Sequence, residues 1–373
     1  MKRTLINNIK NIFGWRTNRR IIVFESDDWG SIRVVSKEVL EKFIVKGYQT
    51  HKCPYDANDR IESNSDLIAL IKTLSSVRDF KGNHPIFTIN NIVANPNFEK
   101  IKISNFKKYF FEPFTTTLER YPDTNLVMDL YNEGLRKKVF QIQFHGREHL
   151  NINKWMTRLQ ENDETTMEAF KEKMISVHHS GSISGKSHAL DAFGNKNIIN
   201  GNISYDTIIK EGVNLFNSIW KFHAKSFIAP CYTWNSNIEP ILYKEGIKYI
   251  QGSHVQLVPS KQANTKIKRK YHFTGQKNSL GQLYLVRNAS FEPTENGKYF
   301  SLKNTLEEIE LSFRYNKPAI ISTHRLNYIG SINPKNREDN LLLLQKLLSE
   351  IIRKWPDVEF MSTDELGDLI TLH

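Results

Sequence analysis

Short runs of apolar and β-branched residues recur along the chain, and segments with helical spacing separate most of them. The strand-like runs cover 21–24, 85–93, 139–144, 226–230, 247–252, 282–290, 319–323 and 358–362. Apolar residues return every three or four positions over 36–47, 64–77, 237–246 and 340–355, which predicts helices. Strands that alternate with helices are typical of parallel βαβ units. So many strands in one chain favour a barrel over an open sheet, and we predict an α/β fold, a distorted (β/α) barrel of about seven strands.

One long interval, 151–225, interrupts this alternation with an inserted helical and loop segment. Its first part, 154–177, has helical spacing, and 178–197 is rich in Gly and Ser, which predicts a loop. Insertions of this kind commonly form lids or substrate walls, so polar residues of this loop are candidate substrate contacts. These are His178, His179, His188 and Asp191. No linker divides the chain, and we expect a single domain over 21–373.

Residues 1–20 form a basic arm before the first strand, with Leu5, Ile9, Ile12 and Phe13 on one helical face. Such a helix can cover the core or lie on an anionic membrane surface, and the sequence leaves both arrangements open. The chain has no apolar run of about 20 residues that could span a membrane. Its start also lacks the apolar segment and cleavage site of a signal peptide. We therefore expect a cytoplasmic protein, with peripheral membrane contact through the arm as an open alternative.

The composition is that of a globular protein, with 39% hydrophobic and 25% charged residues. The formal net charge of +12 is spread along the chain in short clusters such as 266–270, which indicates a solvated basic surface. Aromatic and basic residues follow no nucleic-acid-binding motif, so we expect no nucleic acid partner. Only Cys53 and Cys231 occur, too few for a disulfide framework or a thiolate metal cluster. Nothing in the sequence indicates an oligomeric state.

Polar residues stand at the ends of several strand-like runs. Asp27 and Asp28 come just after 21–24, His145 and His149 follow 139–144, and His324 follows 319–323. In a parallel barrel all carboxyl ends of the strands open on one face, so these side chains would converge. Two adjacent carboxylates repel and need a positive partner, and two histidines four residues apart suit a divalent metal. We predict a metal site of His145, His149 and one of the two aspartates, Asp27 or Asp28, with zinc favoured.

Such a site would support hydrolysis. Zinc held by two histidines and an aspartate keeps positions for water and a substrate carbonyl, lowers the pKa of the water and polarises the carbonyl. The aspartate that does not bind the metal would accept the water's proton. His324 is the candidate acid that protonates the leaving group.

Four motifs, in this order, resemble those of the polysaccharide deacetylase family. They are ESDDWG at 25–30, HGREH at 145–149, APCYTW at 229–234 and ISTHR at 321–325. The family consists of metal-dependent esterases with a distorted (β/α) barrel. The resemblance spans about 21–330 and implies that Asp27 is the base, that Asp28, His145 and His149 bind the metal, and that His324 is the catalytic acid.

The third motif departs from the family pattern, which is Arg-x-Pro-Tyr. Here Ile228 stands in place of the Arg and Cys231 in place of the Tyr, although Pro230 is kept. A backbone N–H can stabilise an oxyanion whatever side chain it carries, so Cys231 could still serve. The missing arginine normally tunes the base. We expect its charge to come from another arginine, with Arg287, Arg147 and Arg325 as the candidates.

Further residues are candidate substrate contacts. The first motif carries Trp29 before its glycine, and the third ends on Trp234, which could form an apolar wall for a sugar or an acetyl methyl group. Arg147 and Arg325 stand next to predicted site histidines and could bind substrate directly.

Two other functions remain open. HGREH also fits H-x-x-E-H, the inverted zinc-peptidase signature with Glu148 as base, but that motif requires both histidines inside a helix, whereas His145 directly follows a strand-like run. A barrel that keeps its metal and binds glycans without hydrolysis is the other alternative. We favour a metal-dependent deacetylase that removes an N-acetyl or O-acetyl group from a poly- or oligosaccharide or a lipid-linked glycan precursor.

Overall fold

The computed structural model describes residues 8, 10–178, 189–194, 204–259 and 268–372. Its main sheet has the strand order β10-β7-β6-β5-β2-β1-β12-β11, and β13 pairs with β1 outside this path. Every pairing in this sheet is parallel. The strands are β1 (Arg20–Trp29), β2 (Phe87–Asn91), β5 (Phe140–Phe144), β6 (Ser226–Ile228), β7 (Tyr249–Ser253), β10 (Leu283–Arg287), β11 (Ala289–Ser290), β12 (Ala319–His324) and β13 (Val358–Met361).

The two edges of this sheet meet in one stretch of chain, 283–290. Its first part, β10, pairs with β7, and its second part, β11, pairs with β12. Asn288 makes the switch: its N–H donates to the Ile320 carbonyl at 3.1 Å, and its Oδ1 accepts from the Ile320 N–H at 2.8 Å. The sheet thereby becomes a nearly closed barrel, so the predicted (β/α) barrel is confirmed, with the run 282–290 divided into two strands.

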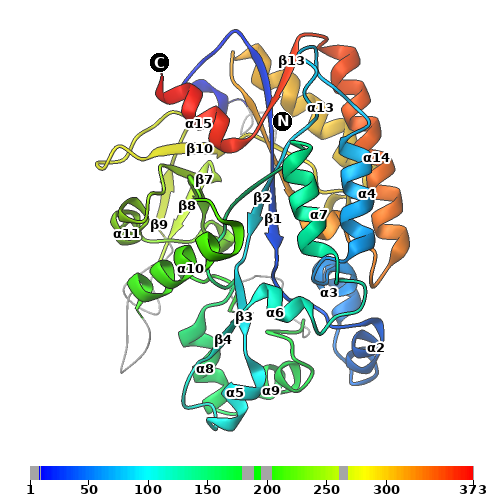
Figure 1. Ribbon diagram of the computed structural model, residues 1–373, viewed down its shortest axis with the longest axis vertical. Coiled ribbons are helices and arrows are strands. Elements are labelled where there is room, and N and C mark those ends of the chain that lie inside the picture. Colours follow the sequence, from blue (N-terminus) through cyan, green and yellow to red (C-terminus); the bar gives the residue numbers. More distant parts are fainter. Residues whose placement is uncertain (1–7, 9, 179–188, 195–203, 260–267, 373) are drawn as a thin grey trace.

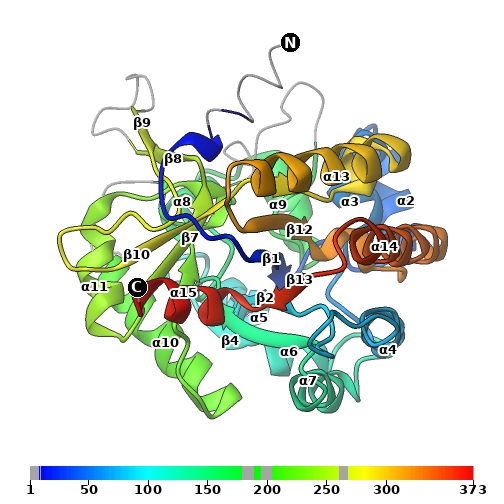
Figure 2. The same cartoon turned by 90° about the horizontal axis from the view of Figure 1, so that it is seen from above.

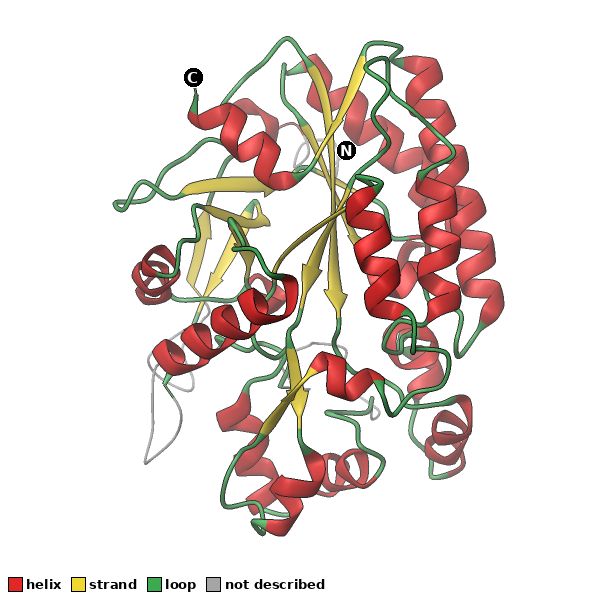
Figure 3. Cartoon of the chain, viewed as in Figure 1, coloured by secondary structure: helices red, strands yellow, loops and turns green. Residues whose placement is uncertain are grey.

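Helices cover the outside of the barrel (Figures 1 and 3). Helices α4, α7, α13 and α14 flank one side and α10 and α11 another, while Figure 2 shows α15 across the end where the strands begin. The α-helices are α2 (Lys37–Val45), α3 (Pro54–Asn58), α4 (Asn64–Leu74), α5 (Phe98–Ile103), α6 (Phe114–Leu118), α7 (Val127–Arg136), α8 (Ile152–Gln160), α9 (Glu164–Lys171), α10 (Tyr205–Trp220), α11 (Glu239–Lys244), α12 (Pro293–Asn296), α13 (Lys298–Arg314), α14 (Pro334–Lys354) and α15 (Thr363–Thr371).

Two small antiparallel sheets and several caps complete the frame. The sheets pair β3 (Ala94–Pro96) with β4 (Phe111–Pro113) and β8 (Val255–Val258) with β9 (Lys268–Tyr271). Ser63 starts α4 and Ser362 starts α15, each through a capping box that satisfies backbone donors of the first turn. The central strand β1 is buried along nearly its whole length, because neighbouring strands flank it and helices cover its outer face.

The insertion at 151–225 holds more helix than its pattern predicts. The segment 154–177 forms two helices, α8 and α9, because Asp163 accepts from the Thr166 N–H and caps a new helix there. Residues 205–220 form α10. Most of the predicted Gly- and Ser-rich loop, with His179 and His188, lies outside the described residues.

The described part of the N-terminal arm docks on the barrel. The Tyr315 hydroxyl donates to the Asn8 Oδ1 at 2.8 Å, and the Asn288 amide donates to the Asn11 Oδ1 at 2.9 Å. Lys317 Nζ donates to the carbonyls of residues 13, 14 and 15. Of the two arrangements considered for the arm, these contacts favour the docked one. Among the described residues, no helix combines the length and the apolarity that crossing a membrane requires.

Candidate functional site

A buried pocket of about 300 Å³ lies where the barrel strands end, and we call it the carboxyl-end pocket. Three strands supply its candidate chemistry, since Asp27 and Asp28 end β1, His145 and His149 follow β5, and His324 ends β12. Its other walls come from the loops after β1 and β6, from α3 and its approach, from the insertion and from α12. These walls are Arg33, Cys53, Pro54, Tyr55, Asp56, Ser176, His178, Leu190, Ala229, Cys231, Tyr232 and Glu295.

A kink at the end of β1 gives the two aspartates different neighbours. The pairing of β1 with β2 shifts register between Ser26 and Trp29, as in a β-bulge, and Asp28 has a φ of 74°. Aspartate tolerates this left-handed conformation better than most residues. Gly30 follows with a φ of 83°, and a Cβ there would lie 2.3 Å from the Ile92 carbonyl, so the turn requires glycine.

Asp28, His145 and His149 have one ligating atom each within 4.8 Å of one another. The Asp28 Oδ1 lies 3.4 Å from His145 Nε2 and 3.3 Å from His149 Nε2. Tetrahedral zinc with bonds of roughly 2.0–2.1 Å would place neighbouring ligand atoms roughly 3.4 Å apart, so this spacing fits a metal ion. All three side chains are buried, so little water can reach the ligating atoms and lie between them.

The protonation of the histidines also fits a metal. His145 Nδ1 donates to the Ile228 carbonyl at 3.0 Å, and because a carbonyl only accepts, its proton is on Nδ1 and Nε2 keeps a lone pair. Within the described part of the chain that buried Nε2 has no hydrogen-bond partner. Burial lowers the pKa of His149 to about 4, so this side chain is neutral at pH 7, the form that binds metals. The three residues could therefore hold a divalent cation.

Asp27 faces an arginine. Arg287 donates from both terminal nitrogens to the two Asp27 oxygens at 2.7 Å, and from Nε to the Glu25 Oε2 at 2.6 Å. Burial alone would raise the pKa of Asp27, but the Arg287 charge and hydrogen bonds outweigh burial and lower that pKa to about 2. Asp27 is thus held ionised by a bidentate pair that also involves Glu25.

The three candidate arginines have separate partners. Only Arg287 contacts Asp27. Arg147 pairs with Glu148 at 2.7 Å and with Glu211, and it lies 4.2 Å over the Phe111 ring. Arg325 pairs with the two carboxylates Asp59 and Glu62. Neither Arg147 nor Arg325 lines the carboxyl-end pocket, so the structure does not place them where a substrate would touch them.

His324 lies beside Asp27, as its register partner on the neighbouring strand β12. Its Nε2 lies 3.8 Å from the Asp27 Oδ2, and its Nδ1 donates to the Glu292 Oε1 at 2.7 Å. Asn327 donates to the other Glu292 oxygen at 2.7 Å and fixes its orientation. Burial opposes the charged imidazolium, but Glu292 and the aspartates outweigh burial and raise the pKa of His324 well above its usual value. An imidazolium in this pocket is therefore stable at neutral pH.

Of the residues expected to contact substrate in the first and third motifs, one lines the pocket and two do not. Cys231 lines the pocket with a φ of 55°. Trp29 and Trp234 do not line it. The Trp29 indole is fully buried and donates to the Ser26 Oγ at 2.9 Å, and the Trp234 indole donates to Glu239 and stacks on His272. Both tryptophans pack in the protein interior, because their rings complete aromatic clusters there.

The peptidase alternative does not fit this geometry. Residues 145–151 form no helix, so the two histidines are not presented from one helical face. Glu148, the base in that alternative, accepts from the Arg147 Nε at 2.7 Å and from the Tyr109 hydroxyl at 3.1 Å. Its carboxylate does not line the pocket.

Several pocket residues carry no motif of their own. Of the insertion candidates, His178 lines the pocket and Asp191 does not. Arg33, Tyr55 and Glu295 line it as well, and the sequence analysis does not single them out. Arg33 could have been found, because it stands five residues after Asp28 in the same strand-end loop. Nothing local marks Tyr55, which reaches the pocket from α3.

The sequence matches no model of a known protein family and no curated protein. The solved structures that resemble its fold include polysaccharide deacetylases, the family that the motifs resemble. One assigned to that family, from Mycobacterium smegmatis, is 9% identical, with 96% of this chain and 93% of that chain covered and a TM-score of 0.45. Another, from Pseudomonas aeruginosa PAO1, is 8% identical, with 94% and 91% covered and a TM-score of 0.44.

An allantoinase is similar to the same degree, with 9% identity, coverage of 95% of this chain and 91% of that chain, and a TM-score of 0.42. Likenesses this weak do not establish a shared activity. What this chain does must follow from the side chains of the carboxyl-end pocket.

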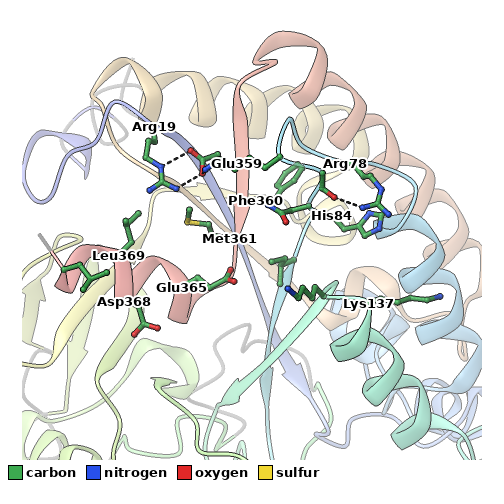
Figure 4. Close-up of a pocket in the computed structure, with 16 residues that line it drawn as sticks. Arg19, Arg78, His84, Lys137, Glu359, Phe360, Met361, Glu365, Asp368 and Leu369 are labelled. Atoms are coloured by element: carbon green, nitrogen blue, oxygen red, sulfur yellow. Dashed lines mark hydrogen bonds and ion pairs between the residues drawn. The ribbon is translucent and has the colours of Figure 1, made fainter.

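A second cavity, of about 480 Å³, lies at the opposite end of the barrel, where β1, β2 and β5 begin, and we call it the amino-end cavity (Figure 4). Its wall carries many cations, and Arg19 and Lys81 both pair with Glu359. Arg78 donates to the Gly82 carbonyl, a contact within its own loop. The described residues hold two clusters of potential metal ligands, the triad and the group of Glu292, Glu295 and His324, and neither reaches this cavity.

Proposed function

We propose that this protein is a zinc-dependent hydrolase that removes an acetyl group from the nitrogen or oxygen of a sugar. One observation carries the proposal: a metal-competent triad, Asp28, His145 and His149, shares the pocket with an ionised carboxylate, Asp27, and a protonated imidazole, His324. Metal-assisted hydrolysis of an amide or ester uses such a set: a base, an acid and a cation that polarises the carbonyl.

The triad would hold the ion through Asp28 Oδ1, His145 Nε2 and His149 Nε2. When bound, zinc lowers the pKa of a water molecule and polarises an acyl carbonyl. Asp27 accepts the proton of the attacking water at its carboxylate. Because Arg287 keeps the pKa of Asp27 at about 2, the carboxylate is fully ionised at neutral pH and can accept a proton, and it is a weaker base than one whose pKa lies near neutrality.

His324 donates the proton that the departing amine or alkoxide requires. Its Nε2 lies on the pocket side, 3.8 Å from Asp27, while Glu292 holds Nδ1 and fixes the orientation of the ring. Glu292 therefore acts through His324 as a positioning residue. The backbone N–H of Cys231 is proposed as a donor to the oxyanion, since Cys231 lines the pocket and occupies the third motif.

A carbohydrate is the proposed substrate for two reasons. The motif order resembles polysaccharide deacetylases, and the pocket of about 300 Å³ is at the small end for ligand sites, which suits one acetylated sugar unit. Lipid-linked glycan precursors belong to the same proposal. Action in the cytoplasm, with the N-terminal arm near an anionic membrane, stays a prediction.

The test is acetate release with matched metal analysis. Protein loaded with zinc is incubated with N-acetylglucosamine, chito-oligosaccharides and O-acetylated sugars, with and without a chelator, and acetate is quantified. We expect release that the chelator abolishes and zinc restores, and an Asp28→Asn variant that has lost both zinc and activity. Glu359→Gln, at the other end of the barrel, is the control variant. Stoichiometric zinc without acetate release from any of these sugars would contradict the proposal.

A further inference from the structure

Arg33 lines the carboxyl-end pocket with a guanidinium that lacks a close partner. Its side chain is 15% exposed, and its Cζ lies 5.1 Å from the centre of the Tyr55 ring. Its nearest carboxylate oxygen, on Asp59, is 3.9 Å away from Nε. Across the described residues this guanidinium donates no hydrogen bond of normal length. Among the described residues, the Arg33 nitrogens are not sealed from solvent as unpaired buried atoms are; they are open to the pocket, where a ligand could accept from them.

The neighbouring carboxylates are already engaged by other donors. Arg325 donates to both oxygens of Asp59, at 3.1 and 3.0 Å. Asp56 accepts the backbone N–H of His178 at 2.7 Å. Arg33 is therefore oriented by Tyr55 and by its net negative surroundings, while its fork of donors stays available to whatever enters the pocket.

We propose that Arg33 binds an anionic group, a carboxylate or a phosphate, on the same sugar whose acetyl group is removed. This inference rests on the proposed function and narrows its substrate to acidic or phosphorylated acetylated sugars. A guanidinium matches both anions through two parallel N–H···O bonds, which an ammonium cannot do. The structure itself does not choose between carboxylate and phosphate, so the experiment includes both.

The position of Arg33 suits one sugar unit. Tyr55 contacts Arg33 through its ring face and also meets the His324 ring in a T-shaped contact, with centroids 5.9 Å apart. Arg33 and the proposed acid thus flank one aromatic ring. A sugar that presents its acetyl group to His324 would reach Arg33 with a neighbouring substituent.

The charge of the pocket allows an anion at this point. Four carboxylates line it: Asp27, Asp28, Asp56 and Glu295. Arg287 neutralises Asp27, a bound cation would neutralise Asp28, the His178 N–H stabilises Asp56, and Glu295 faces the charge of His324. Arg33 is the only arginine or lysine among the described residues that line the pocket, so it is the group that an anionic substituent would meet.

The alternative is that Arg33 is a structural counter-charge for Asp28 and Asp59. That role predicts that removing the charge weakens zinc binding or stability and slows every substrate equally. The anion-binding role predicts instead that the loss depends on the charge of the substrate. The two are separated by comparing substrates within one variant.

The experiment measures kcat/KM for N-acetylglucosamine, N-acetylglucosamine 1-phosphate and N-acetylmuramic acid with the zinc-loaded wild type, Arg33→Lys, Arg33→Gln and the distant control Arg78→Gln. We expect the wild type to prefer an anionic sugar, and Arg33→Gln to reduce the anionic-to-neutral ratio roughly 10- to 100-fold, the worth of a hydrogen-bonded charge. The anionic-to-neutral ratio of Arg33→Lys should lie between those of the wild type and Arg33→Gln, because lysine keeps the charge but cannot form the bidentate hydrogen bonds. Which anionic sugar is preferred identifies the substituent.

Equal losses on all three sugars, or a wild type without preference, would overturn the inference and leave the proposed deacetylase intact. Binding of glucosamine 1-phosphate by calorimetry tests Arg33 without turnover, and equal affinity for wild type and Arg33→Gln would also overturn it. No acetate from any sugar, together with weaker binding in Arg33→Gln, would instead reject the deacetylase and keep the anion site.

Discussion

The two cavities of this barrel are both highly charged, and they differ in how their charges are arranged. The amino-end cavity is the larger, about 480 Å³ against about 300 Å³ for the carboxyl-end pocket. Two of its cations are partly exposed, with exposed fractions of 38% for the Arg19 side chain and 45% for the Lys81 side chain. Both form ion pairs with Glu359. The charges there pair with one another in contact with solvent, where such pairs contribute little.

At the carboxyl-end pocket the polar groups are buried and face a common centre. The side chains of Asp28, His145 and His149 are 6%, 3% and 8% exposed, and their ligating atoms point at each other rather than at donors. Buried polar atoms without partners are rare in proteins and call for an explanation. Size and charge therefore do not separate the two cavities, whereas the clustering of buried ligating atoms around one point does.

We expect the largest effect at the carboxyl-end pocket from the substitution Asp27→Asn. The substitution keeps the shape of the side chain but removes the base, so we expect turnover to fall roughly 10²- to 10⁴-fold while zinc content is unchanged. Steady-state acetate release and metal analysis on the same sample measure both quantities. A variant that keeps more than half of the wild-type rate would assign the proton acceptor elsewhere.

Arg287→Ala tests the pair that sets the state of Asp27. It leaves Glu25 and Asp27 buried without their cation, and removing one partner of a buried pair typically costs about 3–5 kcal/mol. We expect strongly reduced turnover, a lower unfolding temperature and retained zinc. Arg287→Lys should recover part of the stability, since the charge returns without the bidentate geometry. Unchanged turnover in Arg287→Ala would remove Arg287 from the mechanism.

Glu292→Gln tests the raised pKa of His324. Burial opposes protonation of His324, and the charge of Glu292 makes the largest contribution that raises its pKa. The variant removes that charge and therefore lowers the pKa of His324. Because the acid must be protonated, activity is present at low pH and is lost as pH rises through the pKa. The basic limb of the rate profile should move to lower pH, with roughly a tenfold rate loss per unit above the new pKa. A basic limb that stays in place would show that His324 is not the titrating acid.

The barrel and the closeness of Asp28, His145 and His149 could be predicted because both depend on local patterns. The runs that become β1, β5 and β12 are short and apolar, and the residues that follow them share one face of any parallel barrel. Even the replacement arginine was among three candidates. Choosing Arg287 from the sequence was not possible, because Arg147 follows His145 and Arg325 follows His324, yet both turn to carboxylates outside the pocket.

The walls of the pocket were predicted poorly for a different reason. Trp29 and Trp234 stand inside the motifs, but their large rings fill the interior, which their sequence positions do not reveal. Arg33 and Tyr55 come from irregular loops and a short helix, where no period marks which side chain points inward. The residues of these walls would contact the substrate, so substrate specificity is harder to predict from the sequence than the barrel is.

The smallest effect is expected at the amino-end cavity, from Glu359→Gln. Hydrogen bonds from Arg19 and Lys81 lower the pKa of Glu359, so its pairs add stability above the unfolded pKa that is lost as pH falls. Glu359 is buried, but Arg19 and Lys81 are partly exposed and stay hydrated without it, so the cost at neutral pH should be at most about 1 kcal/mol, smaller in high salt and absent in acid. Thermal unfolding at several pH values measures this, alongside turnover that should match the wild type. A large loss of turnover would mean that the two ends of the barrel are coupled. The charged pairs of Glu359, where the strands begin, would then affect catalysis where the strands end.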